Sequence, residues 1–287
     1  MKKKWSMAAG AAVLAYAVGG LSPVVAASDG KLQAIEKAGV FKVGVLTNEH
    51  PFSSKKITSD GFEGFDVDIA QYVAQEIVND KPIEIEYVGV TKATRVPLLQ
   101  GGDIDMLVAT LSITDERKKV IDFSIPYYPA PIGIMVPKDS DLKTLDDLAN
   151  KTNCNPQGSA AWMFFQEGMK NVGKHEVLET IDVVQLPSPT DCLLALRQKR
   201  DVDFIAGDYA TMLGQITNAP ELVMMDDTVG EELNQFGIAI AQGNDDLVAE
   251  VNKAICKSFS DGAWEESFSK WFVGGKPPQG WPQQCNN

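Results

Sequence analysis

The chain has 287 residues, of which 44% are hydrophobic and 23% charged, a composition typical of globular proteins and long enough for two hydrophobic cores. It excludes a disordered or fibrous chain. The formal net charge is −13, and a surface this acidic repels nucleic acids and anionic lipid, so neither is expected as a partner.

The first 27 residues have the pattern of a secretory signal peptide. Three lysines at positions 2–4 precede an uncharged, small-residue run over 7–21, and Val25-Ala26-Ala27 follow. The apolar run is shorter than the ~20 residues that a transmembrane helix needs. We expect export to the periplasm or the cell exterior with cleavage near Ala27. Cleavage removes three lysines and no acid, which changes the net charge from −13 to −16.

Strand-like and helix-like runs alternate through the first half of the mature chain. The predicted strands cover 41–46, 83–90 and 106–109, and the predicted helices begin after Gly64, near Thr94 and at Thr114. Asp66 is a credible cap of the first of these helices. Alternation of this kind predicts an α/β fold with a largely parallel sheet and helices on both faces.

The second half repeats the pattern. Its predicted elements are strands over 132–136, 182–186, 204–206 and 236–241, and helices over 142–149, 160–170, 190–199 and from Tyr209 onward. Two closing helices carry apolar stripes that run from Leu247 to Phe259 and from Trp264 to Phe272. The Pro- and Gly-containing tail after them is expected to be irregular.

A polar segment from Thr110 to Arg117 lies where a buried strand ends and a helix begins. Ligands of open α/β sheets bind outside the carboxyl ends of the strands, and helix N-termini there suit a carboxylate. The planar guanidinium of Arg117 can hold a carboxylate with two hydrogen bonds. The alternative is that Arg117 pairs with Asp115 or Asp122 on the helix surface.

Three other positions are candidates, each with a structural alternative. Gly158-Ser159-Ala160 precedes a helix and could hold an anion or cap that helix. Asp208 follows an apolar strand and could accept an ammonium group or cap the next helix. Arg95 begins a helix on the same side as Thr110, where it could bind a ligand or remain a solvated surface charge.

Evidence for catalysis is weak. The sequence has no nucleophile-elbow motif and no phosphate-binding loop, so we expect no cofactor. Only two histidines, His50 and His175, accompany the four cysteines, and no C-x-x-C spacing occurs, which argues against a metal site. The cysteines, at positions 154, 192, 256 and 285, allow three disulfide pairings between which the sequence alone does not choose.

Taken in order, these segments resemble family 3 of the bacterial extracellular solute-binding proteins, the polar amino-acid receptors of ABC importers. The resemblance covers about residues 35–275. Its most specific segments are GFDVDIA (64–70), SITDERKKVIDFSIPYY (112–128), QGSAA (157–161) and DVDFIAGD (201–208). It implies a monomeric, non-catalytic receptor without cofactors that closes two lobes around a free amino acid and delivers it to a membrane permease.

The resemblance also implies the roles of individual residues. In that family the arginine at the place of Arg117 binds the α-carboxylate of the ligand, assisted here by Thr110 and Ser112. The residues expected to complete the site from the other lobe are Ser159 and Ala160, which meet the carboxylate, and Asp208, which accepts the α-ammonium group.

A further segment indicates which amino acid the receptor binds. TKATRVPLLQ (91–100) looks most like the glutamate/aspartate-binding branch, whose arginine at the place of Arg95 contacts the side-chain carboxylate. Glu49 lies near a position where many members have an aromatic residue. If Glu49 paired with Arg95, the case for an acidic ligand would weaken.

The implied fold is the two-lobed periplasmic-binding-protein fold (type II), with a mostly parallel sheet flanked by helices in each lobe and two hinge crossings. We assign 28–129 and 236–287 to lobe one and 130–235 to lobe two. A disulfide between lobes would restrict the hinge, so we predict Cys154–Cys192 and Cys256–Cys285. The same fold also hosts dehydratases, for which Glu49 or His50 would be the general acid, and sensors.

Overall fold

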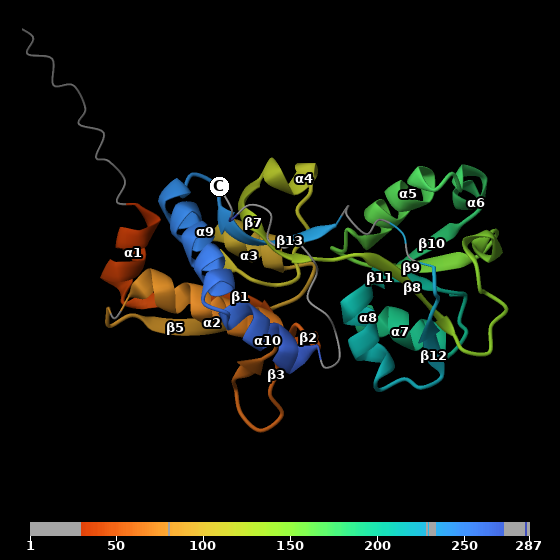
Figure 1. The fold of residues 1–287 in the computed structure, drawn as a ribbon, viewed down its shortest axis with the longest axis horizontal. Helices are drawn as coiled ribbons and strands as arrows, with labels where there is room; N and C mark the ends of the chain where they lie inside the picture. The colour runs from red at the N-terminus through yellow and green to blue at the C-terminus, as the bar shows by residue number, and fades with distance from the viewer. Residues whose placement is uncertain (1–29, 80, 228, 230–233, 273–284, 286–287) are drawn as a thin grey trace, which may run out of the picture.

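The computed structural model describes residues 30–79, 81–227, 229, 234–272 and 285. The predicted signal peptide, its cleavage near Ala27 and most of the tail lie outside these residues and stay predictions. None of the helices in the described ranges is long and apolar enough to cross a membrane. Figure 1 shows two α/β lobes side by side, with the first and last elements of the chain in the left-hand lobe.

Lobe one is built on a five-stranded sheet in the order β5-β1-β6-β13-β7. Its strands are β1 (Val40–Leu46), β5 (Glu84–Val90), β6 (Met106–Leu107), β7 (Ile121–Pro129) and β13 (Gln235–Ala241). β1 runs parallel to β5 and β6, whereas β13 is antiparallel to β6 and β7. Phe41, Val43 and Val45, on one face of β1, are fully buried, and Leu46 on the other face is 3% exposed, so the end of this strand is covered on both faces.

The helices of lobe one are α1 (Lys31–Ala38), α2 (Phe65–Val78), α3 (Arg95–Gly101), α4 (Asp115–Lys118), α9 (Asp245–Ser260) and α10 (Ala263–Trp271). The interpretation of Asp66 as a cap is wrong, because Gly64 occupies the N-cap of α2. Asp66 lies inside the helix with its side chain fully buried. A small sheet of β2 (Asn48–Glu49), β3 (Ser53–Lys55) and β4 (Phe62–Glu63) was not predicted.

Lobe two centres on β8 (Ile132–Pro137), which is antiparallel to β11 (Ile205–Asp208) and β12 (Leu222–Met224). β9 (Thr152–Pro156) runs parallel to β10 (Asp182–Leu186), and a bridge between Asn153 and Phe204 brings β9 beside the start of β11. Its helices are α5 (Ala161–Asn171), α6 (His175–Glu179), α7 (Pro189–Arg197), α8 (Tyr209–Ile216) and a 3-10 turn, η1 (Leu145–Leu148). The two-lobed α/β fold class is confirmed.

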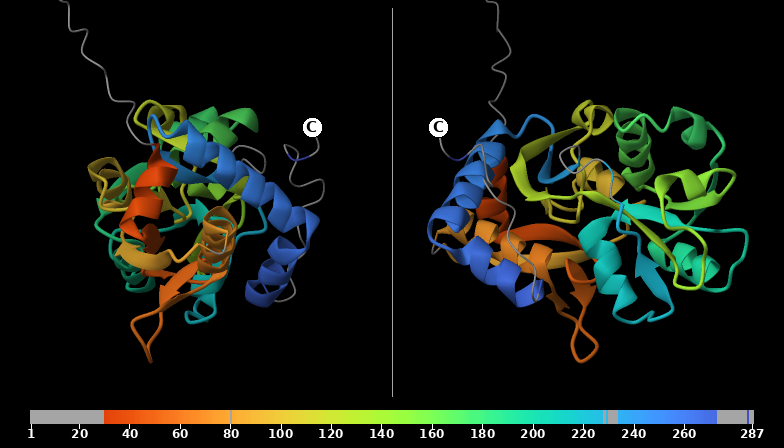
Figure 2. Two further views of the ribbon diagram at one scale, coloured as in Figure 1. Left: turned by 90° about the vertical axis from the view of Figure 1, so that its left-hand side faces the viewer. Right: turned by 45° about the vertical axis from the view of Figure 1, so that its right-hand side comes forward.

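The chain passes between the lobes twice, and the two crossings are hydrogen-bonded to each other. Ala130, between β7 and β8, donates its N–H to the carbonyl oxygen of Asn234, just before β13, at 2.9 Å. In the right-hand view of Figure 2, the yellow-green chain between β7 and β8 runs from one lobe to the other. The lobe boundaries 28–129, 130–235 and 236–287 remain a proposal.

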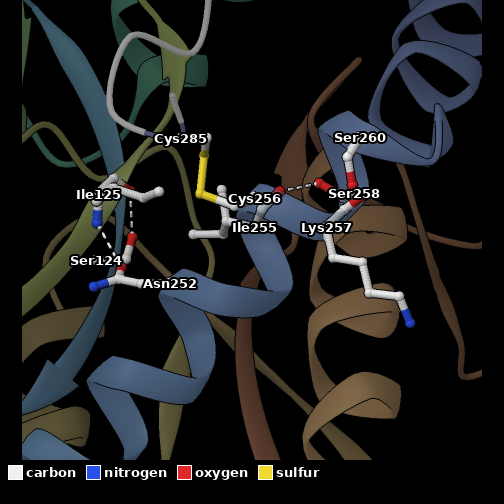
Figure 3. Close-up of a disulfide and its surroundings, with 9 residues drawn as sticks. All are labelled: Ser124, Ile125, Asn252, Ile255, Cys256, Lys257, Ser258, Ser260 and Cys285. Carbon is white, nitrogen blue, oxygen red and sulfur yellow. Dashed lines mark hydrogen bonds between the residues drawn. A yellow bond between two sulfur atoms is a disulfide. The ribbon is translucent and has the colours of Figure 1, made fainter. Parts of the chain in front are cut away.

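Both disulfides join the predicted partners. Cys154–Cys192 links β9 to α7 with a Cα–Cα distance of 5.6 Å, and Cys256–Cys285 links α9 to the tail with 5.3 Å. Figure 3 shows the second bond beside Asn252 of α9, whose Oδ1 accepts a hydrogen bond from Ile125 N at 2.8 Å. This contact fastens α9 to β7 close to the irregular pairing of β7 with β13.

Candidate functional site

The site begins at the turn that follows β6. Thr110 has a backbone φ of +45°, which is a strained conformation for a β-branched residue. Its N–H donates to Asp66 Oδ2 at 2.8 Å, and Tyr127 Oη donates to Asp66 Oδ1 at 2.8 Å. Burial raises the pKa of Asp66 to about 7, although these hydrogen bonds oppose the rise. The buried carboxyl group of Asp66 therefore holds the backbone of the turn at Thr110 in place.

Arg95 is 2% exposed, so the alternative of a solvated surface charge is wrong. Nη1 donates to the carbonyl oxygens of Ala109 and Thr110, and Nη2 donates to Gly158 O of lobe two at 3.2 Å. Nε is buried and has no hydrogen-bond partner among the residues that the structure describes. Burial, with repulsion from Arg117, lowers the pKa of Arg95 to about 9. The Arg95 guanidinium thus lies between the lobes, and at least its Nε–H is available to donate a further hydrogen bond.

Like Arg95, Arg117 extends its side chain from lobe one to lobe two. Nη1 donates to Ser112 O at 2.7 Å, and Nη2 donates to Gly158 O at 3.0 Å. The alternative that Arg117 pairs with an acid on its own helix surface is wrong. Lys118 pairs with Asp115 at 3.3 Å, and Asp122 accepts from a backbone N–H. Burial lowers the pKa of Arg117 to about 10, against the attraction of nearby Asp208.

The segment before α5 brings lobe two against lobe one. Gly158 has a φ of +76°, and a Cβ there would overlap the carbonyl oxygen of Lys92. Ser159 Oγ accepts from Ala161 N at 3.2 Å, a cap-like contact, so the structural alternative for this hydroxyl has support. Ser159 and Ala160 are both half-buried at the cleft. The segment offers Gly158 O to both guanidinium groups.

Asp208 ends β11 and occupies the N-cap position of α8, but its side chain makes no capping hydrogen bond. Instead, Oδ1 accepts from Asn234 Nδ2 at 2.8 Å. Burial raises the pKa of Asp208, and the charge of Lys92 opposes that rise. The capping interpretation is therefore wrong, and Asn234 is a neighbour that the sequence did not identify.

Glu49 pairs with Lys92 and not with Arg95. Lys92 Nζ lies 2.9 Å from Glu49 Oε1, with both side chains almost fully buried. The two groups are not aligned as a hydrogen bond, because Glu49 Oε1 has no hydrogen-bond partner within the described ranges. No ion pair joins Arg95 to Glu49 among the described residues. A cavity of about 30 Å³ lies beside this pair and is also lined by Ser159 and Asp208.

Lys92 was missed by the sequence prediction, although its position gave a signal. It follows the carboxyl end of β5, inside the 91–100 segment that singled out Arg95. His50, the other candidate near Glu49, is exposed and meets the ring of Trp271 edge-on at 6.2 Å. Within the described ranges, no group of three or more His, Cys, Asp or Glu residues could hold a metal ion.

Residues 41–274 match the family of bacterial extracellular solute-binding proteins, family 3. A curated relative, the ABC transporter glutamine-binding protein GlnH of Bacillus subtilis (strain 168), is 31% identical over 240 residues, which are 84% of this chain and 84% of the relative. Other relatives are named for binding glutamate and aspartate, histidine or cystine.

Solved structures agree with this fold. An ancestral arginine-binding protein bound to arginine has a TM-score of 0.69 and 29% identity, covering 82% of this chain and 98% of that one. The ancestral amino acid-binding protein AncCDT-1, described as a precursor of cyclohexadienyl dehydratase, has a TM-score of 0.70 and 27% identity, covering 85% of this chain and 100% of that one. The protein belongs to family 3 of the bacterial extracellular solute-binding proteins, the amino-acid-binding receptors of ABC importers.

Proposed function

We propose that this receptor binds glutamate or aspartate outside the cytoplasm and presents it to an ABC permease. Arg117 takes the α-carboxylate, and Asp208 takes the α-ammonium group. Arg95 takes the side-chain carboxylate. The remaining members of the proposed site are Thr110, Ser112, Ser159 and Ala160, which surround the α-carboxylate, and Glu49, which orients Lys92.

The observation that carries this proposal is a buried guanidinium that has no acidic partner among the described residues. Arg95 is 2% exposed, and within that part of the chain it donates only to carbonyl oxygens. Glu49, which could have neutralised it, faces Lys92. A buried charge is costly unless it is paired, so an anionic side chain from the ligand has a favourable place to bind. An arginine fork also matches a carboxylate with two aligned hydrogen bonds.

The charges around the cleft agree with this choice. Three cations, Lys92, Arg95 and Arg117, face two carboxylates, Glu49 and Asp208. Glutamate and aspartate carry a net charge of −1, which would balance this excess of one positive charge when the nearby Asp66 carboxyl group is protonated. Because the site is buried, each uncompensated charge there weighs more than it would at the surface.

A thermal-shift screen of the twenty amino acids tests the proposal, because a bound ligand raises the midpoint of unfolding. We expect glutamate or aspartate to give the largest shift. Arg95→Met should reduce the shift from the acidic amino acid far more than the shift from glutamine. Arg197→Met is the matched control, since Arg197 pairs with Glu221 on the surface. A top ranking of arginine, lysine or a hydrophobic amino acid would refute the acidic-ligand proposal and leave the receptor assignment standing.

Glutamine is the second candidate. Lys92 and Glu49 offer one donor and one acceptor side by side, a pair that suits the oxygen and the NH₂ of a carboxamide. A glutamine shift larger than the glutamate shift, lost in Glu49→Ala, would favour this candidate. The dehydratase alternative is tested in the same samples, because a receptor returns its ligand chemically unchanged after incubation.

A further inference from the structure

The lobes also touch away from the proposed ligand contacts, at one face of α8. Gly214, in the second half of this helix, lies against the backbone of His50 and the ring of Pro51 in lobe one. A Cβ built on Gly214 would overlap the carbonyl oxygen of His50 and lie 2.8 Å from Pro51 Cδ. Ala210, one helical turn earlier, packs against the hydrophobic core of lobe one. In Figure 1, α8 is the helix of the right-hand lobe that lies beside β2.

The atoms on both sides of the contact between Gly214 and residues 50–51 are held in place. Backbone atoms make up most of the obstacle at Gly214, and they cannot rotate away as a flexible side chain could. Pro51 is buried, and its carbonyl oxygen accepts a hydrogen bond from Phe65 N at 3.0 Å, at the start of α2. An added methyl group would therefore have to move α8 away from lobe one.

The same helix carries a proposed ligand contact. Asp208 occupies the N-cap position of α8, six residues before Gly214, which is about 9 Å along a helix. A rigid helix transmits a displacement at one end to the other. Holding Gly214 away from His50 would thus also hold Asp208 away from the half of the site that lobe one supplies.

We infer that Gly214 is a positioning residue for lobe closure: its missing side chain lets α8 reach the distance from lobe one at which both halves of the site meet the ligand. The inference does not depend on which amino acid is bound. It rests on the contact of α8 with the His50 backbone and the Pro51 ring, and any ligand held by both lobes would need that contact.

Gly214→Ala tests the inference, because it should leave the stability of the free protein unchanged or higher while it lowers the affinity for the ligand. Gly214 has an ordinary helical φ, and alanine has a higher helix propensity than glycine, so the free variant should be at least as resistant to urea as the wild type. Binding should weaken by about tenfold or more, since a smaller fraction of molecules can close. Calorimetry would use L-glutamate, L-glutamine and L-arginine in parallel, and every one that binds the wild type should bind the variant more weakly.

Gly214→Leu extends the test, and Leu213→Ala is the matched control. Small-angle scattering should show that saturating L-glutamate or L-glutamine compacts the wild type but not Gly214→Leu. Leu213 is exposed, so Leu213→Ala should keep wild-type affinity and compaction. Wild-type affinity in Gly214→Ala would overturn the inference. So would a loss of affinity matched by an equal loss of urea resistance, because that would indicate packing within lobe two.

Discussion

Asp66 Oδ2 accepts a hydrogen bond from the backbone N–H of Thr110 at 2.8 Å, and this contact holds a threonine in a left-handed conformation. The carbonyl oxygens of Ala109 and Thr110 then face Arg95. A fully buried carboxyl group in α2 therefore determines where a guanidinium of the proposed site lies. The pKa of Asp66, raised to about 7 by burial, makes this contact sensitive to pH.

Asp66 should make the free energy of unfolding fall as the pH rises from about 4 to about 7. Its pKa is about 7 in the folded protein against 3.8 ordinarily, so in this interval the folded state binds a proton that the unfolded state releases. Asp66→Asn imitates the protonated carboxyl group, because its amide can accept from Thr110 N–H and donate to Tyr127 Oη. Urea unfolding across this range should show that the stability difference, wild type minus variant, falls with pH and levels off above 7.

The control for that measurement is Asp60→Asn, because Asp60 is fully exposed. Its stability difference from the wild type should stay nearly constant with pH. A constant difference for Asp66→Asn as well would contradict the raised pKa.

Removal of Arg117 or Asp208 should abolish tight binding without unfolding the protein. Each substitution to alanine leaves a buried charge of the ligand unpaired, which typically costs about 2–5 kcal/mol. We expect calorimetric affinity to fall by well over tenfold for each variant, and Arg117→Lys to recover only part, since lysine lacks the planar fork. Arg197→Ala, on the surface of lobe two, should bind normally. Normal binding by both Arg117→Ala and Asp208→Ala would refute the proposed site.

The elements with clear hydrophobic patterns were predictable from the sequence. The strand predicted over 182–186 has the same bounds as β10, and the apolar run at 41–46 differs from β1 by one residue. The 2- and 3-residue strands β2 and β3 were not predicted. Both strands consist of polar residues without an alternating hydrophobic pattern. Their extended conformation depends on packing against the rest of lobe one.

The positions of the residues in the proposed site were partly predictable as well. Arg117 lies in the short helix α4 that follows β6, and Asp208 ends β11, so the sequence already put both near the carboxyl ends of strands. Their partners were harder to find. Asn234 lies 26 residues from Asp208, and only the return crossing brings the two together. The choice of Lys92 over Arg95 as the partner of Glu49 depends on packing distances that the sequence does not specify.

The Cys256–Cys285 bond should contribute stability without affecting the ligand site. It closes a loop with a sequence separation of 29, for which the chain-entropy model gives up to about 4 kcal/mol. The bond lies beside Asn252 and Ile125 in lobe one, as Figure 3 shows. The double variant Cys256→Ser/Cys285→Ser should unfold at lower urea and keep wild-type affinity. A marked change in affinity would indicate that the tail contributes to the cleft.

Glu49→Gln should separate the two candidate ligands. The substitution keeps the size of the side chain but leaves Lys92 buried without its anionic partner, which typically costs about 3–5 kcal/mol. An acidic ligand can supply the missing charge, whereas a neutral ligand cannot. The free variant should therefore melt at a lower temperature than the wild type, and the increase in melting temperature caused by glutamate should be larger than in the wild type.

The matched control for this experiment is Glu63→Gln, an exposed glutamate of β4, which should leave both the free melting temperature and the ligand shifts unchanged. Two results would contradict the expected effect of Glu49→Gln, and each would assign Glu49 a different role. If Glu49→Gln lost glutamate binding as completely as Asp208→Ala, Glu49 would have to contact the ammonium group of the ligand. If only the glutamine shift fell, Glu49 would be the acceptor for a carboxamide, because a buried acceptor that pairs with an NH₂ group discriminates strongly against a ligand that lacks it.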